Sequence, residues 1–323
     1  MRVLLTGASG WLGRYLAPAL RRAGHGVVGL DVAPGPDTQL IGSVADRALV
    51  DRAFADHGTE AVIHAGALHK PDIARYPRQA FVDVNVTGTL NLLEAAAARR
   101  CRHFVFTSTT SLMISHALRA GEGEAAAWID ESLTPLVPRN IYGVTKLAAE
   151  RLCRLIHDEQ DLPVVILRTG RFFPEEDDTH RALSGENMKA NELLHRRLTV
   201  EDAVAAHLLA LERAPALGFD TFIISAPTPF VRADAPALRI DAPAVIARYF
   251  PDAAELYARR GWQLPATLDR VYDASHAERR LGFQAQTDFA AVLDALRTGA
   301  PSPVAHDPAY VPPKEVSAGG PML

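Results

Sequence analysis

A glycine-rich turn near the amino terminus constrains the fold more than any other feature of the sequence. The residues TGASGWLG, at positions 6–13, follow the apolar run 2–6 and open a stretch with helical periodicity. In a strand–turn–helix unit of this kind Gly7 permits the tight turn, Gly10 lets the backbone approach a pyrophosphate, and Gly13 allows close helix packing. The free N–H groups and the dipole at the helix N-terminus attract phosphate. The turn therefore predicts an α/β sheet that binds a dinucleotide.

The remaining apolar runs continue the alternation of strands and helices. The predicted strands cover residues 2–6, 27–31, 61–66, 103–108, 163–169 and 221–226, and the predicted helices cover residues 12–23, 46–57, 84–100 and 141–160, with a further helix beginning at Thr199. The strands are rich in branched and aromatic residues without strict alternation, which is typical of strands covered on both faces. This order predicts a Rossmann-type, doubly wound parallel sheet.

Pro and charged residues become more frequent beyond about residue 170. We expect residues 1–170 to form the nucleotide-binding domain, with the helix and strand of 199–226 returning to it. Residues 171–198 and 227–297 would form a small C-terminal substrate-binding lobe. The Pro- and Gly-rich segment 298–323 is expected to be a loosely held tail.

The overall charge and the cysteine count argue against several classes of protein. A formal net charge of −4 over 323 residues, without basic blocks, gives no electrostatic footprint for nucleic acid or an anionic membrane. Cys101 and Cys153 have no metal-ligand spacing, so neither a disulfide framework nor a metal site is expected. No signal-like segment follows Met1, and no apolar stretch reaches membrane-spanning length. We expect a cytoplasmic protein that acts on a small molecule.

Asp31 ends the second predicted strand, eighteen residues beyond Gly13. This is close to the spacing of about 20 residues at which an acidic side chain binds the adenosine ribose 2′-hydroxyl. A carboxylate there would repel a 2′-phosphate, so the expected cofactor is NAD rather than NADP. The alternative is a turn aspartate that caps the strand end.

Tyr142 and Lys146 lie four residues apart, hence on one face of the predicted helix. A nearby cation favours the phenolate and would lower the pKa of the tyrosine, which could then act as a general acid or base on a substrate hydroxyl. The alternative is an accidental surface pair. Because the chain otherwise uses mostly arginine as its cation, a lysine at this position favours the functional interpretation.

A cluster of hydroxyl side chains ends the fourth predicted strand, in the sequence FVFTSTTS at residues 104–111. The carboxyl ends of the strands are where open α/β sheets bind their ligands. One of these hydroxyls could donate a hydrogen bond to the reacting oxygen. The alternative is a polar turn without a catalytic role.

Taken together, these motifs resemble the extended short-chain dehydrogenase/reductase family, in its NAD-dependent epimerase/dehydratase branch. The resemblance covers residues 1–226 and is carried by TGASGWLG, Asp31, VIHAGA (62–67), NVTGTLNLLEA (85–95), FVFTSTT (104–110), YGVTK (142–146) and LRTGRF (167–172). It implies that Thr109, Tyr142 and Lys146 are catalytic, and that Asn85 organises the backbone or water beside them. It also implies a homodimer formed through helices 84–100 and 141–160.

The resemblance implies a larger set of residues around the two ligands. The expected cofactor-binding residues are Gly7, Ser9, Gly10, Trp11, Leu12, Gly13, Asp31, Ser43, Val44, Ala65, Gly66, Ala67, Asn85, Thr107, Tyr142, Lys146 and Arg168. The candidate substrate contacts are His69, Thr109, Thr110 and Arg171.

Departures from the family pattern narrow the chemistry. Members that dehydrate or decarboxylate nucleotide sugars carry a carboxylate just after the catalytic hydroxyl, whereas this chain has Thr110 and Ser111. Members that bind nucleotide sugars have an asparagine where this chain has Arg171, so either Arg171 binds an anion or the substrate is small and not nucleotide-linked. The alternative for Arg171 is a surface arginine beside acidic residues 175–178. The Gly- and Ala-rich insert 121–127 would be a flap over the site or a surface loop.

The favoured function is NAD-dependent oxidation or epimerisation of a sugar or sugar derivative, with Tyr142 as the acid/base. Whether the keto product leaves, as in a dehydrogenase, or is reduced again, as in an epimerase, stays open. A second hypothesis is an NAD(P)-dependent reductase of a hydrophobic, steroid- or flavonoid-like ketone. A third is a cofactor-sensing protein without turnover, although both Tyr142 and Lys146 are present.

Overall fold

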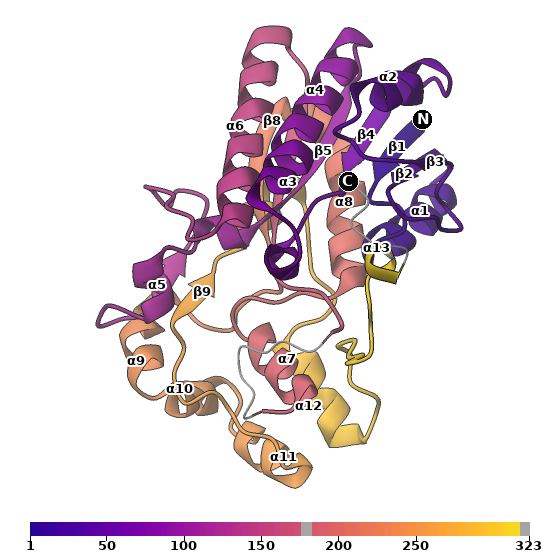
Figure 1. The fold of residues 1–323 in the computed structure, drawn as a ribbon. Helices are drawn as coiled ribbons and strands as arrows, with labels where there is room; N and C mark the ends of the chain where they lie inside the picture. Colours follow the sequence, from indigo (N-terminus) through magenta and orange to yellow (C-terminus); the bar gives the residue numbers. More distant parts are fainter. Residues whose placement is uncertain (176–182, 317–323) are drawn as a thin grey trace.

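A seven-stranded parallel sheet forms the centre of the molecule in the computed structural model, which describes residues 1–175 and 183–316 (Figure 1). The strands lie in the order β3-β2-β1-β4-β5-β7-β8, and all of them are parallel. The chain adds β2 and β3 on one side of β1 and then adds β4 and the later strands on its other side, so the topological switch point lies between β1 and β4. Their bounds are β1 Arg2–Thr6, β2 Gly26–Asp31, β3 Leu40–Ile41, β4 Ala61–His64, β5 His103–Thr109, β7 Val164–Thr169 and β8 Phe219–Ile224. The predicted doubly wound parallel sheet is confirmed.

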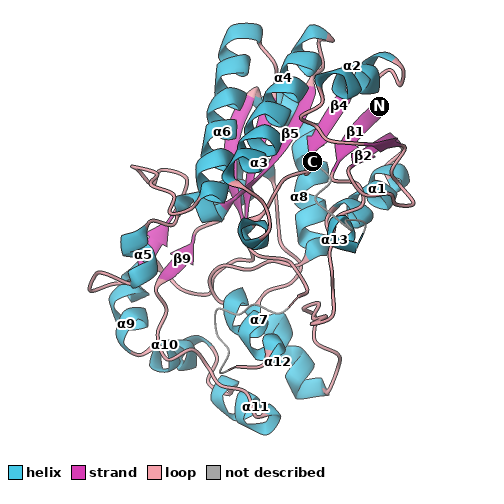
Figure 2. Cartoon of the chain, in the orientation of Figure 1, coloured by secondary structure: helices cyan, strands magenta, loops and turns pink. Residues whose placement is uncertain are grey.

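Helices cover both faces of the sheet because successive strand residues point to opposite sides. Val3 and Leu5 pack with α1 (Gly13–Arg22) and α8 (Val200–Leu217), whereas Leu4 packs with the helices of the other face. Those helices are α2 (Arg47–Ala55), α4 (Gly88–Ala98) and α6 (Ile141–Gln160), which lie side by side in Figure 2. Both strand faces are therefore apolar, which accounts for the unbroken apolar runs in the sequence.

The predicted helix 84–100 is wrong in its first part. The chain forms α3 (Arg78–Val82), then one turn of π-helix, η2 (Asp83–Thr87), and only then α4. The wide turn contains Asn85, whose side chain is buried and fully hydrogen-bonded. Turns of this kind are frequent at functional sites.

A smaller lobe follows the sheet and has its own apolar core. Its members include Leu193, Phe230, Ile246, Tyr257 and Phe289. The lobe helices are α7 Gly185–Leu193, α9 Ala235–Ile240, α10 Ala242–Tyr249, α11 Ala253–Arg260 and α12 Phe289–Thr298. Shorter elements are α5 His116–Ala120, η1 Lys70–Ala74, η3 Thr110–Met113, η5 Arg232–Asp234 and η6 Ala277–Leu281.

The insert 121–127 joins the sheet domain to the lobe. It leads into β6 (Ala127–Ile129), which pairs in parallel with β9 (Arg270–Tyr272) in a separate two-stranded sheet. The Ala126 amide also donates to the carbonyl oxygen of Ala235. The end of the insert is thus fastened to the lobe, while Gly123 and Glu124 are exposed.

The C-terminal segment differs from the expected loosely held tail as far as residue 316. Val304 is buried against the lobe core, and a last short helix, α13 (Pro313–Val316), lies next to α1 in Figure 1. The rest of the expected tail, 317–323, lies outside the described residues.

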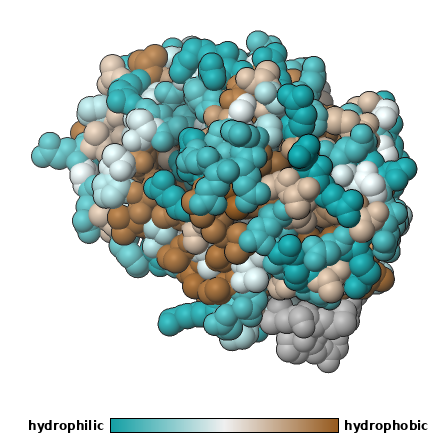
Figure 3. All heavy atoms as spheres, turned by 90° about the horizontal axis from the view of Figure 1, so that it is seen from above, coloured by the Kyte–Doolittle hydropathy of each residue, from teal (hydrophilic) through white to brown (hydrophobic). Residues whose placement is uncertain are grey.

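Seen from above, hydrophilic side chains predominate on the surface and the apolar ones form separate patches (Figure 3). Among residues 1–175 and 183–316, no helix combines the length and the apolar character needed to cross a membrane.

Candidate active site

The glycine turn lies at the carboxyl end of β1, against the loop that follows β4. Gly7 has φ +73°, and a Cβ atom there would lie 2.8 Å from the amide nitrogen of Gly66. A Cβ atom on Gly13 would lie 2.1 Å from the carbonyl oxygen of Gly7. A Cβ atom on Gly10 would meet only that same oxygen within 4 Å among the described residues, at 3.3 Å. Packing therefore requires glycine at 7 and 13, whereas Gly10 leaves open space beside the turn.

Asp31 ends β2 beside this turn, and the turn itself orients the carboxylate. The Ser9 amide donates to Oδ2 at 2.9 Å, and the Ala33 amide donates to Oδ1 at 3.1 Å. Burial raises the pKa of Asp31, although these amide donors oppose the shift. Each oxygen can still accept a further hydrogen bond. The open space at Gly10 and the oriented carboxylate fit the pyrophosphate and the adenosine ribose of a dinucleotide.

The other residues expected at the cofactor lie around the same edge of the sheet. The indole of Trp11 donates to the carbonyl oxygen of Phe172 at 3.1 Å, which links the turn to the segment after β7. Thr107 offers its carbonyl oxygen to Lys146 and its hydroxyl to His207. Leu12, Ser43, Val44, Ala65 and Ala67 lie in the loops at the carboxyl ends of β1, β3 and β4 or next to them. Their contacts with a cofactor stay predictions.

Tyr142 lies in the first turn of α6, with its ring packed in an apolar cluster beside Phe81. The side chain of Thr109, the last residue of β5, lies beside its phenol. The pKa of Tyr142 is raised to about 12, mainly by burial; the Thr109 side chain opposes this shift, and the nearby carboxylate of Asp72 adds to it. The structure therefore brings together the predicted acid/base and the predicted hydroxyl partner.

Lys146 lies one turn further along α6 and is 2% exposed. Its ammonium donates to the carbonyl oxygen of Thr107 at 2.6 Å and lies 3.9 Å from the centre of the Phe106 ring. Burial lowers the pKa of Lys146 to about 7. The expected lowering of the Tyr142 pKa by this lysine is wrong for the structure, because burial dominates at both side chains.

Asn85 holds the loop after β4 against α6. Its amide nitrogen donates to the Leu68 carbonyl at 3.0 Å and to the Thr145 hydroxyl at 3.1 Å, while its oxygen accepts from the Leu68 amide. The next residue, His69, places its ring 5.8 Å from the Tyr142 ring. Burial lowers the pKa of His69 to about 3, so the imidazole is neutral. It can present a hydrogen-bonding nitrogen beside the phenol.

Arg168, expected at the cofactor, is instead engaged in a buried ion pair. Its guanidinium contacts Glu150 of α6 at 2.7 Å and 3.0 Å, and Ser108 of β5 donates to the same carboxylate at 2.6 Å. This network connects α6 to β5 and β7 one turn beyond Lys146. Contact of Arg168 with a cofactor stays a prediction, whereas its ion pair with Glu150 is a structural role.

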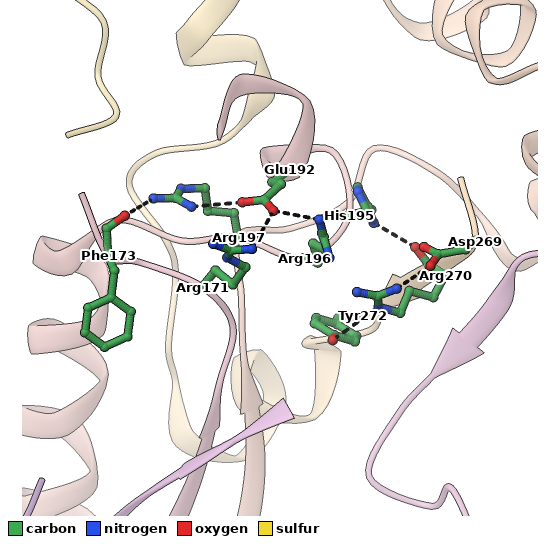
Figure 4. Close-up of polar contacts among 9 residues, drawn as sticks. All are labelled: Arg171, Phe173, Glu192, His195, Arg196, Arg197, Asp269, Arg270 and Tyr272. Atoms are coloured by element: carbon green, nitrogen blue, oxygen red, sulfur yellow. Dashed lines mark hydrogen bonds and ion pairs between the residues drawn. The ribbon is translucent and has the colours of Figure 1, made fainter. Parts of the chain in front are cut away.

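Arg171 belongs to a cluster of arginines gathered around one buried glutamate (Figure 4). Glu192 contacts Arg196 at 2.7 Å, Arg197 at 2.9 Å and Arg171 at 3.5 Å. These three guanidinium groups hold the pKa of Glu192 well below its ordinary value against the effect of burial. The Arg197 side chain also donates to the carbonyl of Phe173, whose ring lies 5.7 Å from that of His69. The cluster therefore adjoins the Tyr142 site.

No carboxylate side chain follows Thr109 directly, because the next two residues are Thr110 and Ser111. Thr110 is 4% exposed and donates to the carbonyl oxygen of Thr169 at 3.3 Å. The Ser111 amide donates to the Thr109 oxygen at 3.1 Å, which fixes the turn. No three or more His, Cys, Asp or Glu side chains in the described parts of the chain are grouped so as to hold a metal ion.

Asp72, Glu150 and Glu192 were missed by the sequence analysis. Asp72 follows β4 and accepts from the His69 amide at 2.6 Å, in a 3-10 turn that no apolar periodicity marks. Glu150 lies four residues after Lys146, so helix spacing could have placed it on the catalytic face. Glu192 and its arginines meet only through the packing of the lobe, which local spacing does not reveal.

The chain is similar to known proteins. The chain matches the model of the NAD dependent epimerase/dehydratase family over residues 3–220. It is 28% identical over 185 residues to UDP-glucose 4-epimerase 4 of Oryza sativa subsp. japonica, with 51% of this chain and 48% of that protein covered. It is 30% identical over 188 residues to dTDP-glucose 4,6-dehydratase of Streptomyces niveus, with 52% and 53% covered. The chain thus spans about half the length of the curated relatives it matches.

A solved structure is similar over most of the chain. This is a short-chain dehydrogenase/reductase superfamily protein of Agrobacterium tumefaciens with bound NAD. The two chains are 26% identical with a TM-score of 0.64, and the match covers 92% of this chain and 96% of the other. The similarity therefore includes the lobe as well as the sheet.

Proposed function

The chain belongs to the NAD-dependent epimerase/dehydratase family, and we propose that it transfers a hydride between NAD and a carbinol carbon of a sugar or sugar derivative. The observation that carries this proposal is that Tyr142 of α6 and Thr109, the last residue of β5, lie beside one another at the carboxyl edge of the sheet. The same edge carries the glycine turn and Asp31. A proton-transfer group and a dinucleotide fold are thus combined.

In the proposed reaction the substrate hydroxyl lies between Thr109 and Tyr142. Thr109 orients its oxygen, and Tyr142 takes the proton as the carbon–oxygen bond acquires double-bond character. Bound NAD supplies the hydride acceptor, the nicotinamide ring. Lys146 holds the nicotinamide ribose, and Asp31 accepts from the hydroxyls of the adenosine ribose. His69, neutral at working pH, is a candidate contact for a second substrate hydroxyl.

Thr110 and Ser111 disfavour dehydration as the reaction, although one of the relatives is a dehydratase. Exchange of a carbon-bound proton needs a base such as a carboxylate, and neither hydroxyl provides one. Oxidation and epimerisation need only the Tyr142 acid/base and the hydride acceptor. We therefore propose a dehydrogenase or an epimerase.

The arginine cluster supports a substrate with an anionic group. Arg171 follows the end of β7 by two residues, and its side chain is 34% exposed. Guanidinium groups bind carboxylate and phosphate through paired hydrogen bonds. This charge argues against a hydrophobic ketone as substrate, and the intact set Thr109, Tyr142 and Lys146 argues against a cofactor sensor without turnover. A uronate or a nucleotide sugar is the expected class.

A substrate panel with two variants tests the proposal. The purified protein would be incubated with NAD and with neutral sugars, uronates or nucleotide sugars, while NADH absorbance and sugar configuration by NMR are followed. Turnover is expected with an anionic member of the panel. Tyr142→Phe is expected to lower kcat by roughly 10²–10⁴-fold with NAD affinity largely kept.

Tyr257→Phe is the matched control for this variant. Tyr257 is equally buried but lies in the lobe core, where its hydroxyl has no hydrogen-bond partner among the described residues. Its loss should leave kcat unchanged. Full activity of Tyr142→Phe would exclude Tyr142 as the acid/base. Failure of the parent protein to bind NAD would exclude the cofactor assignment.

A further inference from the structure

The C-terminal segment crosses from the lobe to the glycine turn. After Val304, which is buried in the lobe, the Asp307 amide donates to the carbonyl oxygen of Pro174 at 2.9 Å. The Tyr310 ring then packs edge-on against Trp11, with ring centres 5.1 Å apart. The guanidinium of Arg14 lies 4.9 Å from the centre of the Trp11 ring and 5.4 Å from that of Tyr310. Tyr310 of this segment thus packs against the glycine turn, which is expected to bind the pyrophosphate, and against the start of α1.

The same segment ends in an ion pair between Lys314 and the buried Asp72, which lies in η1 after β4. The Lys314 ammonium lies 2.6 Å from Oδ2 of Asp72, which is 1% exposed and also accepts from the His69 amide. Oδ1 of Asp72 has no hydrogen-bond partner among the described residues. A buried carboxylate needs such a cation, and its loss is costly. The contact is therefore stronger than an exposed ion pair on a mobile tail would be.

The two contacts lie on either side of the expected path of the dinucleotide. That path runs from Asp31 past the glycine turn to Tyr142. Tyr310 contacts Trp11, which belongs to the glycine turn. Lys314 contacts Asp72, which accepts from the amide of His69, and the ring of His69 lies 5.8 Å from that of Tyr142. The segment therefore extends from the glycine turn to the Tyr142 site.

We propose that residues 304–316 form a clasp over the dinucleotide site, held by the contacts of Tyr310 with Trp11 and of Lys314 with Asp72. The inference rests on the proposed binding of NAD. Exchange of the cofactor requires both contacts, Tyr310 with Trp11 and Lys314 with Asp72, to break. NAD therefore stays bound between turnovers. Retention of this kind suits an epimerase, in which the reduced cofactor returns its hydride to the same substrate.

The rate of NADH release tests the clasp. Full-length protein loaded with NADH would be mixed with excess NAD, and the change in NADH fluorescence followed by stopped flow. Lys314→Met, Tyr310→Ala and a chain ending at Ala305, which keeps Val304 in the lobe core, are each expected to release NADH at least about tenfold faster. This corresponds to the loss of one charge-assisted or aromatic contact.

Arg259→Met is the matched control, because it removes an exposed cation of the lobe far along α11. It should release NADH at the rate of the parent protein. Circular dichroism would establish that each variant is folded, and the two single substitutions keep the test valid if the shortened chain does not fold.

Three results would overturn the clasp. An unchanged release rate in all variants would show that the segment does not retain the cofactor. Tighter NADH binding in the shortened chain would show that the segment competes for the site. Absence of NADH binding in the parent protein would instead remove the proposed function itself, and the clasp with it.

Discussion

At the scale of single residues, Tyr142 and Lys146 illustrate how burial outweighs spacing. Their separation by one helical turn predicts that the cation lowers the pKa of the phenol. In the structure the ammonium turns to the Thr107 carbonyl and the Phe106 ring, and the pKa of Tyr142 is raised to about 12. The phenol is thus protonated at neutral pH. Proton abstraction therefore depends on charges and hydrogen bonds that the bound ligands add.

Lys146→Met should change stability in a manner that depends on pH. The pKa of Lys146 is about 7 in the folded protein, against an ordinary 10.5. Between these values the unfolded chain binds more protons than the folded one, so this group makes the free energy of unfolding rise with pH. Below pH 7 the parent protein bears the full cost of a buried ammonium, and the methionine variant avoids it.

Urea unfolding of parent and variant at several pH values measures this effect. We expect Lys146→Met to be more stable than the parent at pH 6 by roughly 2–4 kcal/mol, with the difference shrinking as the pH rises toward 10. Activity should be lost at every pH. A difference in stability that is the same at pH 6 and pH 9 would contradict the lowered pKa.

At the scale of elements, α6 carries the proposed catalytic pair, Tyr142 and Lys146, and is anchored by one buried network. Glu150 pairs with Arg168 of β7 and accepts from Ser108 of β5, the residue before the last one of that strand. The network thereby fixes the position of α6 along its axis relative to β5, the strand that ends in Thr109. Displacement of the helix would separate Thr109 from Tyr142.

Glu150→Gln is expected to lower the free energy of unfolding by about 3–5 kcal/mol, because it leaves the Arg168 guanidinium buried without its counter-charge. It should also lower kcat through misplacement of the helix, with rescue by Glu150→Asp no more than partial. Asp158→Asn is the matched control on the same helix, since it removes the exposed partner of Arg154. That change should cost less than about 1 kcal/mol. Equal losses in the two variants would show that the buried network does not anchor α6.

The elements that could be predicted from the sequence are those whose pattern is local and long. Six of the seven strands of the main sheet, and helix α6, agree with their predicted ranges within a few residues, because burial on both faces leaves unbroken apolar runs. The two-residue strand β3 was not predicted, because it is too short to form such a run. The π-turn η2 was missed because a buried Asn85 differs little from a helical residue in periodicity. The helices of the lobe are ten residues long or shorter, so no sustained periodic pattern marks them.

The same distinction explains which parts of the site were found. Gly7, Asp31, Tyr142 and Lys146 lie in short motifs with fixed spacing. The Lys314 contact with Asp72 joins residues 242 positions apart, and the pairing of β6 with β9 joins Ala127 to Arg270, far apart in the sequence as well. Contacts of that kind depend on the packing of the lobe against the sheet. They cannot be derived from a local pattern.

At the scale of the whole molecule, one face of α6 exposes aliphatic side chains around Arg151. Val144 and Leu155 are 47% and 46% exposed, and Ala148 lies between them on the same side of the helix. The neighbouring helix α4 packs beside α6 on the same layer of the molecule. Large aliphatic side chains at this spacing are typical of a helix that packs against another chain. The expectation of a homodimer through these two helices is consistent with this stripe, and it stays a prediction.

A charge in the stripe should separate such a dimer. Leu155→Glu, alone or with Val144→Glu, would place unpaired carboxylates at the centre of a symmetric interface, where each is met by its own copy. We expect the parent protein to sediment as a dimer and the double variant as a monomer in analytical ultracentrifugation. Ile240→Glu is the matched control, because Ile240 is 76% exposed but belongs to the lobe. The dimer interface on α6 would be excluded if the parent protein sedimented as a monomer. It would also be excluded if Ile240→Glu dissociated the dimer to the same extent. Leu155 lies more than three turns from Tyr142 along α6, so the single Leu155 variant also tests whether turnover requires the dimer, since its effect on kcat would come through assembly and not through the site.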